Sequence, residues 1–149
     1  MNLEYMDLAF KEAEKAFRHG EVPVGAIIVK NDKIIAKAYN KKEKSRCSVE
    51  HAEIIAIKRA SRKLKNWRLE GCDIYVTLEP CPMCASAIKQ ARIQNVYSGI
   101  QNKDEKNNFL IKKIFESDKV NPSVNFINNL SVKKSETLLQ KFFSSRRKK

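Results

Sequence analysis

The chain has 149 residues, of which 42% are hydrophobic, and this length and composition fit one globular domain with a buried core. Its 30 Lys and Arg residues against 17 Asp and Glu give a formal net charge of +13, which favours a polyanionic partner, nucleic acid or an anionic membrane surface, over a merely soluble basic protein. No segment approaches the roughly 18 apolar residues of a membrane span and the N-terminus lacks a signal-peptide pattern, so we expect a cytoplasmic protein and exclude a transmembrane one.

The first part of the chain predicts a helix followed by a β-hairpin. Apolar residues recur every three or four positions over residues 3–17, as in an amphipathic helix. Two β-rich runs, Val22–Val29 and Lys33–Tyr39, flank Asn31-Asp32, a two-residue turn signal. The first run is apolar almost throughout, so we expect a strand covered on both faces. A basic loop, Lys41–Arg46, follows the hairpin.

The rest of the chain alternates between predicted helices and strands. We expect a polar loop over Ile100–Asn108 and a last helix that begins after Ser131 or Ser135. This alternation predicts an α/β fold with a central sheet and helices on its faces, and residues 1–149 are expected to form a single domain. The other predicted helices cover residues 51–65, 82–91 and 109–115, and the other strands Asp73–Leu78, Asn95–Gly99 and Ser123–Ile127.

The candidate metal site lies within residues 51–84. His51, Cys81 and Cys84 can supply three ligands, the number that a catalytic zinc site takes while it leaves one position open for water. The order H-x-E…P-C-x-x-C is a known signature of zinc-dependent nucleobase deaminases, and it is specific only when both halves occur together. Pro82 begins a helix that places Cys81 and Cys84 on one face, near an N-terminus that lowers the pKa of thiols. The alternative is half of a structural zinc knuckle, which needs a fourth ligand.

The remaining candidate ligands are assigned other roles. Cys47 and Cys72 have no C-x-x-C partner, so we interpret both as small packing residues and not as part of a second zinc site or a disulfide. His19, the other histidine, stands in the last turn of the first predicted helix, where a solvated helix-end residue is expected. The metal assignment therefore rests on His51.

Glu53 is the candidate catalytic residue. Because two thiolates neutralise the charge of Zn²⁺, such a site acidifies water less than three histidines would, and a nearby base is needed. Glu53 is expected to take a proton from the water that attacks the amino-bearing ring carbon, and to pass protons to the ring nitrogen and the departing ammonia. His51 and Glu53 can face one pocket only from the first turn of a helix. The alternative for Glu53 is a carboxylate that only interacts with the helix dipole, and Glu79 is expected to be a structural hydrogen-bonding carboxylate.

Four stretches resemble one known family: EVPVGAIIV (21–29), HAEIIAI (51–57), TLEPCPMCASA (77–87) and LLQKFFSSRRKK (138–149). They are similar to the bacterial tRNA-specific adenosine deaminases, members of the cytidine deaminase-like superfamily that convert the anticodon wobble adenosine to inosine. The zinc motifs fit the whole superfamily, whereas the hairpin and the two phenylalanines before a basic ending favour the tRNA branch.

The resemblance implies a fold, partners and contacts. It implies a three-layer α/β/α cytidine deaminase-like fold with a central mixed sheet of about five strands, a homodimer, and an adenosine flipped out of the anticodon loop of a tRNA into a zinc pocket. By position it implies that Asn40 holds the target nucleotide, Ala52 offers a backbone N–H, Pro23 and Val24 line the pocket, and Phe142 or Phe143 meets neighbouring bases.

One segment departs from the family. After the fourth strand the family usually has an Asp followed by a turn rich in Gly and Ala. Here Asn102 takes the position of that Asp, or Asp104 does if the alignment slips, and residues 104–108 (DEKNN) replace the small residues. Because this loop flanks the nucleic acid in the family, the substrate preference is where a difference is expected.

Two other functions remain open. A free-base or nucleoside deaminase acting on guanine or cytosine would share the zinc motifs, but the net charge of +13 argues against it, since a small neutral base needs no polyanion groove. An RNA-binding protein with a purely structural zinc is the second. RNA contacts are expected at the ending Arg146–Lys149 and, alternatively, along the basic run Lys58–Arg68.

Overall fold

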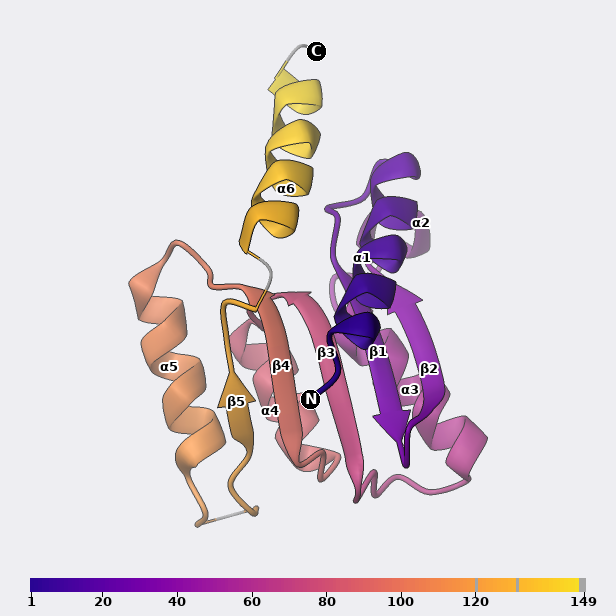
Figure 1. Ribbon diagram of the computed structural model, residues 1–149, viewed down its shortest axis with the longest axis vertical. Helices are drawn as coiled ribbons and strands as arrows, with labels where there is room; N and C mark the ends of the chain where they lie inside the picture. Colours follow the sequence, from indigo (N-terminus) through magenta and orange to yellow (C-terminus); the bar gives the residue numbers. More distant parts are fainter. Residues whose placement is uncertain (120, 131, 148–149) are drawn as a thin grey trace.

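The centre of the fold is a five-stranded mixed sheet. A computed structural model describes residues 1–119, 121–130 and 132–147. The strand order is β2-β1-β3-β4-β5, in which β1 is antiparallel to both of its neighbours and β3, β4 and β5 are parallel (Figure 1). The elements in chain order are α1 (Leu3–Arg18), β1 (Gly25–Lys30), β2 (Lys33–Tyr39), α2 (Lys42–Ser45), α3 (Ala52–Leu64), β3 (Cys72–Leu78), α4 (Pro82–Gln90), β4 (Asn95–Ile100), α5 (Glu105–Glu116), β5 (Asn125–Ile127) and α6 (Val132–Arg147).

Helices cover both faces of the sheet. On one face α1 packs against β1, β2 and β3, and α6 contacts α1 and β4. On the other face α3 packs against β1 and β2, and α4 contacts both α3 and α5. Figure 1 shows α6 extending beyond the carboxyl ends of β3 and β4. The predicted three-layer α/β/α architecture is confirmed.

The central strand β1 is buried on both faces, as its apolar run predicts. Ala26 and Ile28 belong to the core beneath α3, α4 and α5, whereas Ile27 and Val29 belong to the core beneath α1. This alternation follows from the two-residue period of a strand. One face of α1 (Met6, Ala9, Phe10) completes the second core.

The hairpin turn has the predicted geometry, but its first strand is shorter than predicted. Asn31 and Asp32 have φ values of 50° and 58°, as a two-residue hairpin turn requires. The strand begins at Gly25 and not at Val22, since the N–H of Val24 turns back to the carbonyl of Val22 (2.9 Å). Val22 and Val24 are thereby able to line the functional site.

Two predicted loops contain helix. The basic loop Lys41–Arg46 holds the short helix α2, and the predicted loop over Ile100–Asn108 ends early because α5 begins at Glu105. The side chain of Asp104 caps this helix by accepting a hydrogen bond from the N–H of Lys106 (3.0 Å). The start of the 109–115 helix was therefore predicted too late. In the described part of the chain, no helix is both long and apolar enough to cross a membrane.

The sheet places the functional site at a change of strand direction. β3 lies between antiparallel β1 and parallel β4. At its carboxyl end the chain passes through Glu79 and Pro80 into Cys81 and α4. In open α/β sheets, ligands bind outside the carboxyl ends of strands at such a switch point.

Candidate metal centre and substrate cavity

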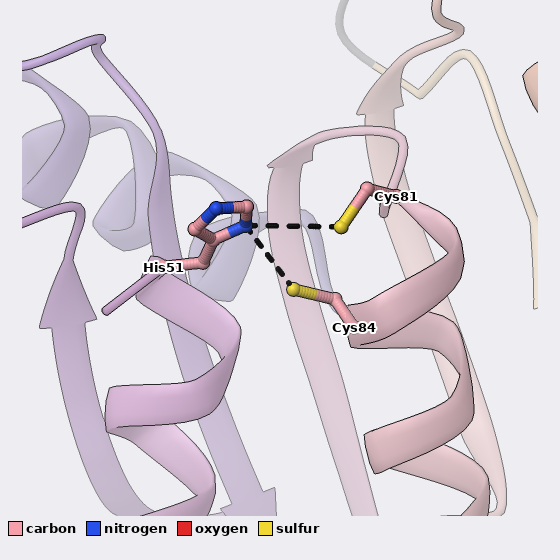
Figure 2. A group of neighbouring side chains, drawn as sticks. All are labelled: His51, Cys81 and Cys84. Atoms are coloured by element: carbon pink, nitrogen blue, oxygen red, sulfur yellow. Dashed lines mark hydrogen bonds between the residues drawn. The ribbon is translucent and has the colours of Figure 1, made fainter. Parts of the chain in front are cut away.

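Two helix N-termini meet at the carboxyl end of β3 and position the three predicted ligands. His51 is the N-terminal cap of α3, Cys81 is the N-terminal cap of α4, and Cys84 lies in the first turn of α4 (Figure 2). Neither His51 nor Cys81 caps its own helix with its side chain. Figure 2 shows instead that both side chains point toward a common centre between the two helices.

The spacing of the donor atoms fits a tetrahedral metal. The Nδ1 atom of His51 lies 3.5 Å from the Sγ atom of Cys84 and 3.7 Å from that of Cys81. Zinc bonds of about 2.3 Å to sulfur and about 2.0–2.1 Å to nitrogen, at the tetrahedral angle, separate such ligands by about 3.6 Å. Within residues 1–119, 121–130 and 132–147, these three residues are the group of His, Cys, Asp or Glu whose ligand atoms converge, all within 4.8 Å of one another.

The surroundings of the two sulfurs favour the charged form of Cys81 and the neutral form of Cys84. The hydrogen bond from Cys84 is the main reason that the pKa of the Cys81 thiol is lowered to about 5. The same bond, together with burial, raises the pKa of Cys84. A cation bound between the two sulfurs would favour the thiolate form of both. The partial positive charge at the N-termini of α3 and α4 acts in the same direction.

Glu53 lies beside this centre with the properties of a proton-transferring group. It is in the first turn of α3, is only 4% exposed, and borders the same cavity as His51 and Cys81. Burial raises the pKa of the Glu53 carboxyl, and a hydrogen bond with Cys84 opposes this change. Because His51 is the cap and Glu53 is in the first turn, both residues line this one cavity.

A cavity of about 200 Å³ lies over the cluster. It is smaller than the roughly 300–1,000 Å³ of sites that bury drug-sized ligands, and its size suits a single base. The residues that line it come from five segments of the chain, which are brought together by the sheet and the two helix N-termini: Val22, Val24, Asn40, Lys42, His51, Ala52, Glu53, Leu78, Glu79, Cys81 and Asn102.

Three of the six predicted substrate contacts reach this cavity. Val24, Asn40 and Ala52 line it, whereas Pro23 is buried and its neighbour Val22 lines the cavity in its place. The amide of Asn40 is held on both sides: its Nδ2 donates to the carbonyl of Val22 (3.3 Å), and its Oδ1 accepts from the backbone N–H of Lys42 (3.1 Å). Asn40 is therefore fixed in place before any ligand binds.

The two phenylalanines of α6 have different surroundings. Phe142 is buried, and its ring lies 6.3 Å from that of Phe17 on α1. Phe143 is 49% exposed and lines a second cavity, of about 500 Å³, together with Leu139 of α6 and residues 101–103 after β4. Phe142 holds α6 against α1, and Phe143 is the one free to contact a ligand.

The sequence did not predict every residue that lines the site. Leu78 and Val22 look like ordinary strand residues, although the rule that ligands bind beyond the carboxyl ends of strands favours Leu78. Lys42 belongs to the basic loop after the hairpin. Of the two alternatives after β4, Asn102 lines the cavity, whereas Asp104 caps α5.

The remaining cysteines and histidine lie outside the cluster. Cys72 is buried in β3, and Cys47 is partly buried in the segment before His51. His19 is exposed, and its ring stacks on Tyr39 at 5.7 Å. The fold and the cluster together define an α/β/α protein whose His51, Cys81 and Cys84 could hold a metal ion.

Comparison with known proteins gives the family. Residues 1–147 match the MafB19-like deaminase family. The chain is 39% identical over 145 residues to a tRNA-specific adenosine deaminase of Bacillus subtilis, which covers 97% of this chain and 90% of that one. A solved structure from a study of A-to-I editing by tRNA:A34 deaminases superposes with a TM-score of 0.85 at 34% identity, over 93% of this chain and 100% of that one. A guanine deaminase of Bacillus subtilis superposes with a TM-score of 0.68 at 29% identity, over 97% and 95%. The chain belongs to the MafB19-like deaminases and to the family of tRNA-specific adenosine deaminases, and it is a hydrolytic deaminase.

Proposed function

We propose that this protein converts the wobble adenosine of a tRNA anticodon to inosine and releases ammonia, using one zinc ion per chain. The observation on which the proposal rests is the buried carboxylate of Glu53 next to the His51, Cys81 and Cys84 cluster, at the base of a cavity sized for one base. The names of the relatives support tRNA adenosine as the substrate.

His51, Cys81 and Cys84 would hold the metal. When bound, zinc supplies a Lewis acid that activates water for attack on the base. The donor set of one imidazole and two thiolates suits zinc, and the separations of 3.5 and 3.7 Å between nitrogen and sulfur need little adjustment to accept it.

Glu53 moves the protons of the reaction. Its raised pKa lets the carboxylate take a proton from the attacking water and return it to the substrate. The first proton goes to the ring nitrogen next to the amino-bearing carbon. Glu53 then takes the remaining proton from the hydroxyl group that has been added to this carbon and passes it to the amine, which leaves as ammonia. Glu53 ends as it began, so one carboxylate serves as base and acid in turn.

The walls of the cavity would bind and orient the nucleotide. Asn40, already fixed by two hydrogen bonds, presents its amide to the sugar or base. Val24 provides an apolar surface for the ring, and the backbone N–H of Ala52 is offered to the base. Phe143, at the second cavity, is placed for stacking on a neighbouring base. Pro23 would act by fixing the backbone between Val22 and Val24.

The positive charge favours RNA over a free base as the substrate. A net charge of +13 attracts phosphates and is of no use for a small neutral ligand. A free-base deaminase is the second candidate, because a guanine deaminase superposes with a TM-score of 0.68. Residues 1–149 would form one deaminase domain that acts as a cytoplasmic homodimer, which the family resemblance supports and which light scattering with size exclusion would test.

A panel of substrates separates the candidates. Purified zinc-loaded protein is incubated with an anticodon stem-loop that has adenosine at position 34, and separately with adenosine, guanine and cytosine, while ammonia and nucleoside products are measured. We expect inosine from the stem-loop and no product from the free compounds. Faster release of ammonia from guanine or cytosine would replace the proposal with the free-base alternative, and no turnover of any substrate would favour a structural zinc.

A further inference from the structure

Glu79 is a buried carboxylate that the proposed reaction does not use. It is 3% exposed, lies between the last residue of β3 and Pro80, and lines the cavity over the metal cluster. Burying a carboxylate is unfavourable unless hydrogen bonds replace its lost water. The partners of this side chain therefore indicate what it does.

Three amide groups satisfy the carboxylate. Oε1 of Glu79 accepts hydrogen bonds from Nδ2 of Asn108 (2.6 Å) and Nδ2 of Asn128 (2.8 Å). Oε2 accepts from Nδ2 of Asn107 (2.8 Å), which also contacts the carbonyl of Pro80 (3.2 Å). The backbone N–H of Glu79 donates to the carbonyl of Ile100 at the end of β4 (2.7 Å). A buried network with all of these bonds in place is rigid.

These bonds connect the turn before Cys81 to two distant segments. Asn107 and Asn108 stand in the first turn of α5, and Asn128 follows β5 on the way to α6. The next residue, Asn129, exchanges two hydrogen bonds with Gln101, at 3.0 and 3.2 Å. The loop between β4 and α5 is thus held at both ends, and this loop contains Asn102, which lines the cavity.

The same loop forms part of the wall between the two cavities, together with Val22 and Leu78. Asn102 lines both of them, and its neighbours Gln101 and Lys103 line the larger one together with Phe143 of α6. Asn107 and Asn108 belong to the DEKNN segment that replaces the small residues usual in the family. Two of the residues that depart from the family pattern therefore form hydrogen bonds with Glu79.

We propose that Glu79 is a positioning residue for the RNA substrate, which holds the wall of residues 101–104 in the shape that receives the reacting nucleotide and its neighbour. The inference rests on the proposed function, in which the reacting nucleotide and its neighbour occupy the two cavities. Glu79 acts through Asn107, Asn108 and Asn128 and does not touch the reacting atoms. Its loss should weaken substrate binding more than it slows the chemical step.

Lys89 offers a matched control at the other end of the same helix. Its side chain is 7% exposed in the last turn of α4, and its Nζ donates to the carbonyls of Ile114 (2.6 Å) and Ser117. Glu79 thus ties the N-terminal end of α5 and Lys89 ties the C-terminal end. Neither Lys89 nor these carbonyls line the two cavities. Loss of Lys89 loosens α5 without altering the wall.

The test compares Glu79→Gln with Lys89→Met in the zinc-loaded protein, by steady-state kinetics on the A34 stem-loop, zinc content and Tm. In Glu79→Gln, an amide N–H₂ group replaces one of the carboxylate oxygens that accept hydrogen bonds from the asparagine side chains, so two donors face each other. We therefore expect KM to rise about tenfold, while kcat changes less than about threefold. Zinc should remain at one per chain. Lys89→Met should lower Tm and leave KM unchanged. Asn128→Ala, which removes one donor, should raise KM in the same direction by less.

Three results would overturn the inference. An unchanged KM in Glu79→Gln with a lower Tm would make the residue merely structural. Loss of zinc with a falling kcat would mean that Glu79 supports the Cys81 turn and not the RNA wall. An equal rise of KM in Lys89→Met would mean that loosening α5 by any route has the same effect. Failure of the proposed function would be seen separately, because the unmodified protein would then produce no inosine.

Discussion

His51 and Cys81 occupy equivalent positions in two neighbouring helices: each is the N-terminal cap, of α3 and of α4, and neither side chain caps its own helix. Both side chains instead meet between the helices, 3.7 Å apart between Nδ1 and Sγ. A metal bound there would therefore link two elements that come from different parts of the chain. Metal binding and stability should be coupled for this reason.

Removing the metal should lower the thermal stability. We expect a chelator to reduce the Tm of the zinc-loaded protein by about 5 °C or more, since a ligand that binds only the folded state contributes its binding free energy to folding. Differential scanning calorimetry with and without chelator, alongside metal analysis, measures the change.

Substitution of single cysteines provides the controls. Cys47→Ser and Cys72→Ser should keep one zinc per chain and the same response to chelator, whereas Cys81→Ser should lose both. Cys72 is buried, so its variant can have a lower Tm throughout. Loss of zinc in either control protein would contradict the ligand assignment.

Replacing Glu53 should separate binding from chemistry. Glu53→Ala leaves the three metal ligands in place, so we expect zinc content and tRNA affinity to stay within about twofold, while the rate falls by roughly 10²–10⁴-fold because general acid–base transfer is lost. Single-turnover kinetics on an A34 stem-loop measures the rate. Glu70→Ala, at an exposed glutamate, is the matched control and should behave like the parent. A Glu53→Ala rate within tenfold of the parent would contradict the proton-transfer role.

Gly25 should be intolerant of a side chain. A Cβ atom at this position would lie 2.1 Å from the carbonyl oxygen of Ala9 and 2.6 Å from the amide nitrogen of Ala13, so α1 would have to move away from β1. We expect Gly25→Ala to lower the free energy of unfolding by about 1–3 kcal/mol, as overpacking does. Urea denaturation checks this, with Ser86→Ala at an exposed position as a control that changes little. Equal stabilities for the two variants would contradict the close packing of α1 on β1.

Local signals in the sequence predict the fold better than they predict the site. The strand Lys33–Tyr39 has the predicted bounds because its turn, Asn31-Asp32, is specified by adjacent residues. The polar sequence of the first turn of α5 predicts a loop, although the structure has a helix there. Its polar side chains Asn107 and Asn108 donate hydrogen bonds to Glu79, which is distant in the chain, so their role cannot be read from the local sequence.

The same limit applies to the lining of the cavity. His51, Glu53 and Cys81 follow from motif spacing, since each motif fits within a single turn and the start of one helix. Val22 and Leu78 come from separate strands and meet only through the order of the sheet. No pattern of neighbouring residues marks them, so they could be identified only from the tertiary structure.

The basic ending of the chain should contribute to RNA affinity. Deleting Arg146–Lys149, of which Lys148 and Lys149 lie outside the described residues, removes four positive charges. We expect weaker tRNA binding and a flatter salt dependence, by about 0.7 in the slope of log K against log salt for each single-strand phosphate that the protein no longer neutralises. Binding is measured in the Glu53→Ala background, so that turnover does not interfere.

The alternative RNA-binding surface provides the comparison for this deletion. Arg62→Ala with Lys63→Ala changes two exposed cations of α3, within the run Lys58–Arg68. An unchanged slope after the deletion, with a flatter slope in the α3 variant, would move the RNA contacts from the ending to that run.

Deamination at the wobble position is tested most directly by mapping inosine in two stem-loops that differ only in the position of one adenosine. One has adenosine at position 34 and the other at position 35, with the remaining loop sequence unchanged. After incubation with the zinc-loaded protein, nuclease digestion and mass spectrometry give the inosine content at each position. We expect inosine at position 34 and none at position 35, because the two cavities receive the reacting base and its neighbour in a fixed order. Equal inosine in both stem-loops, or none in either, would contradict the proposed function.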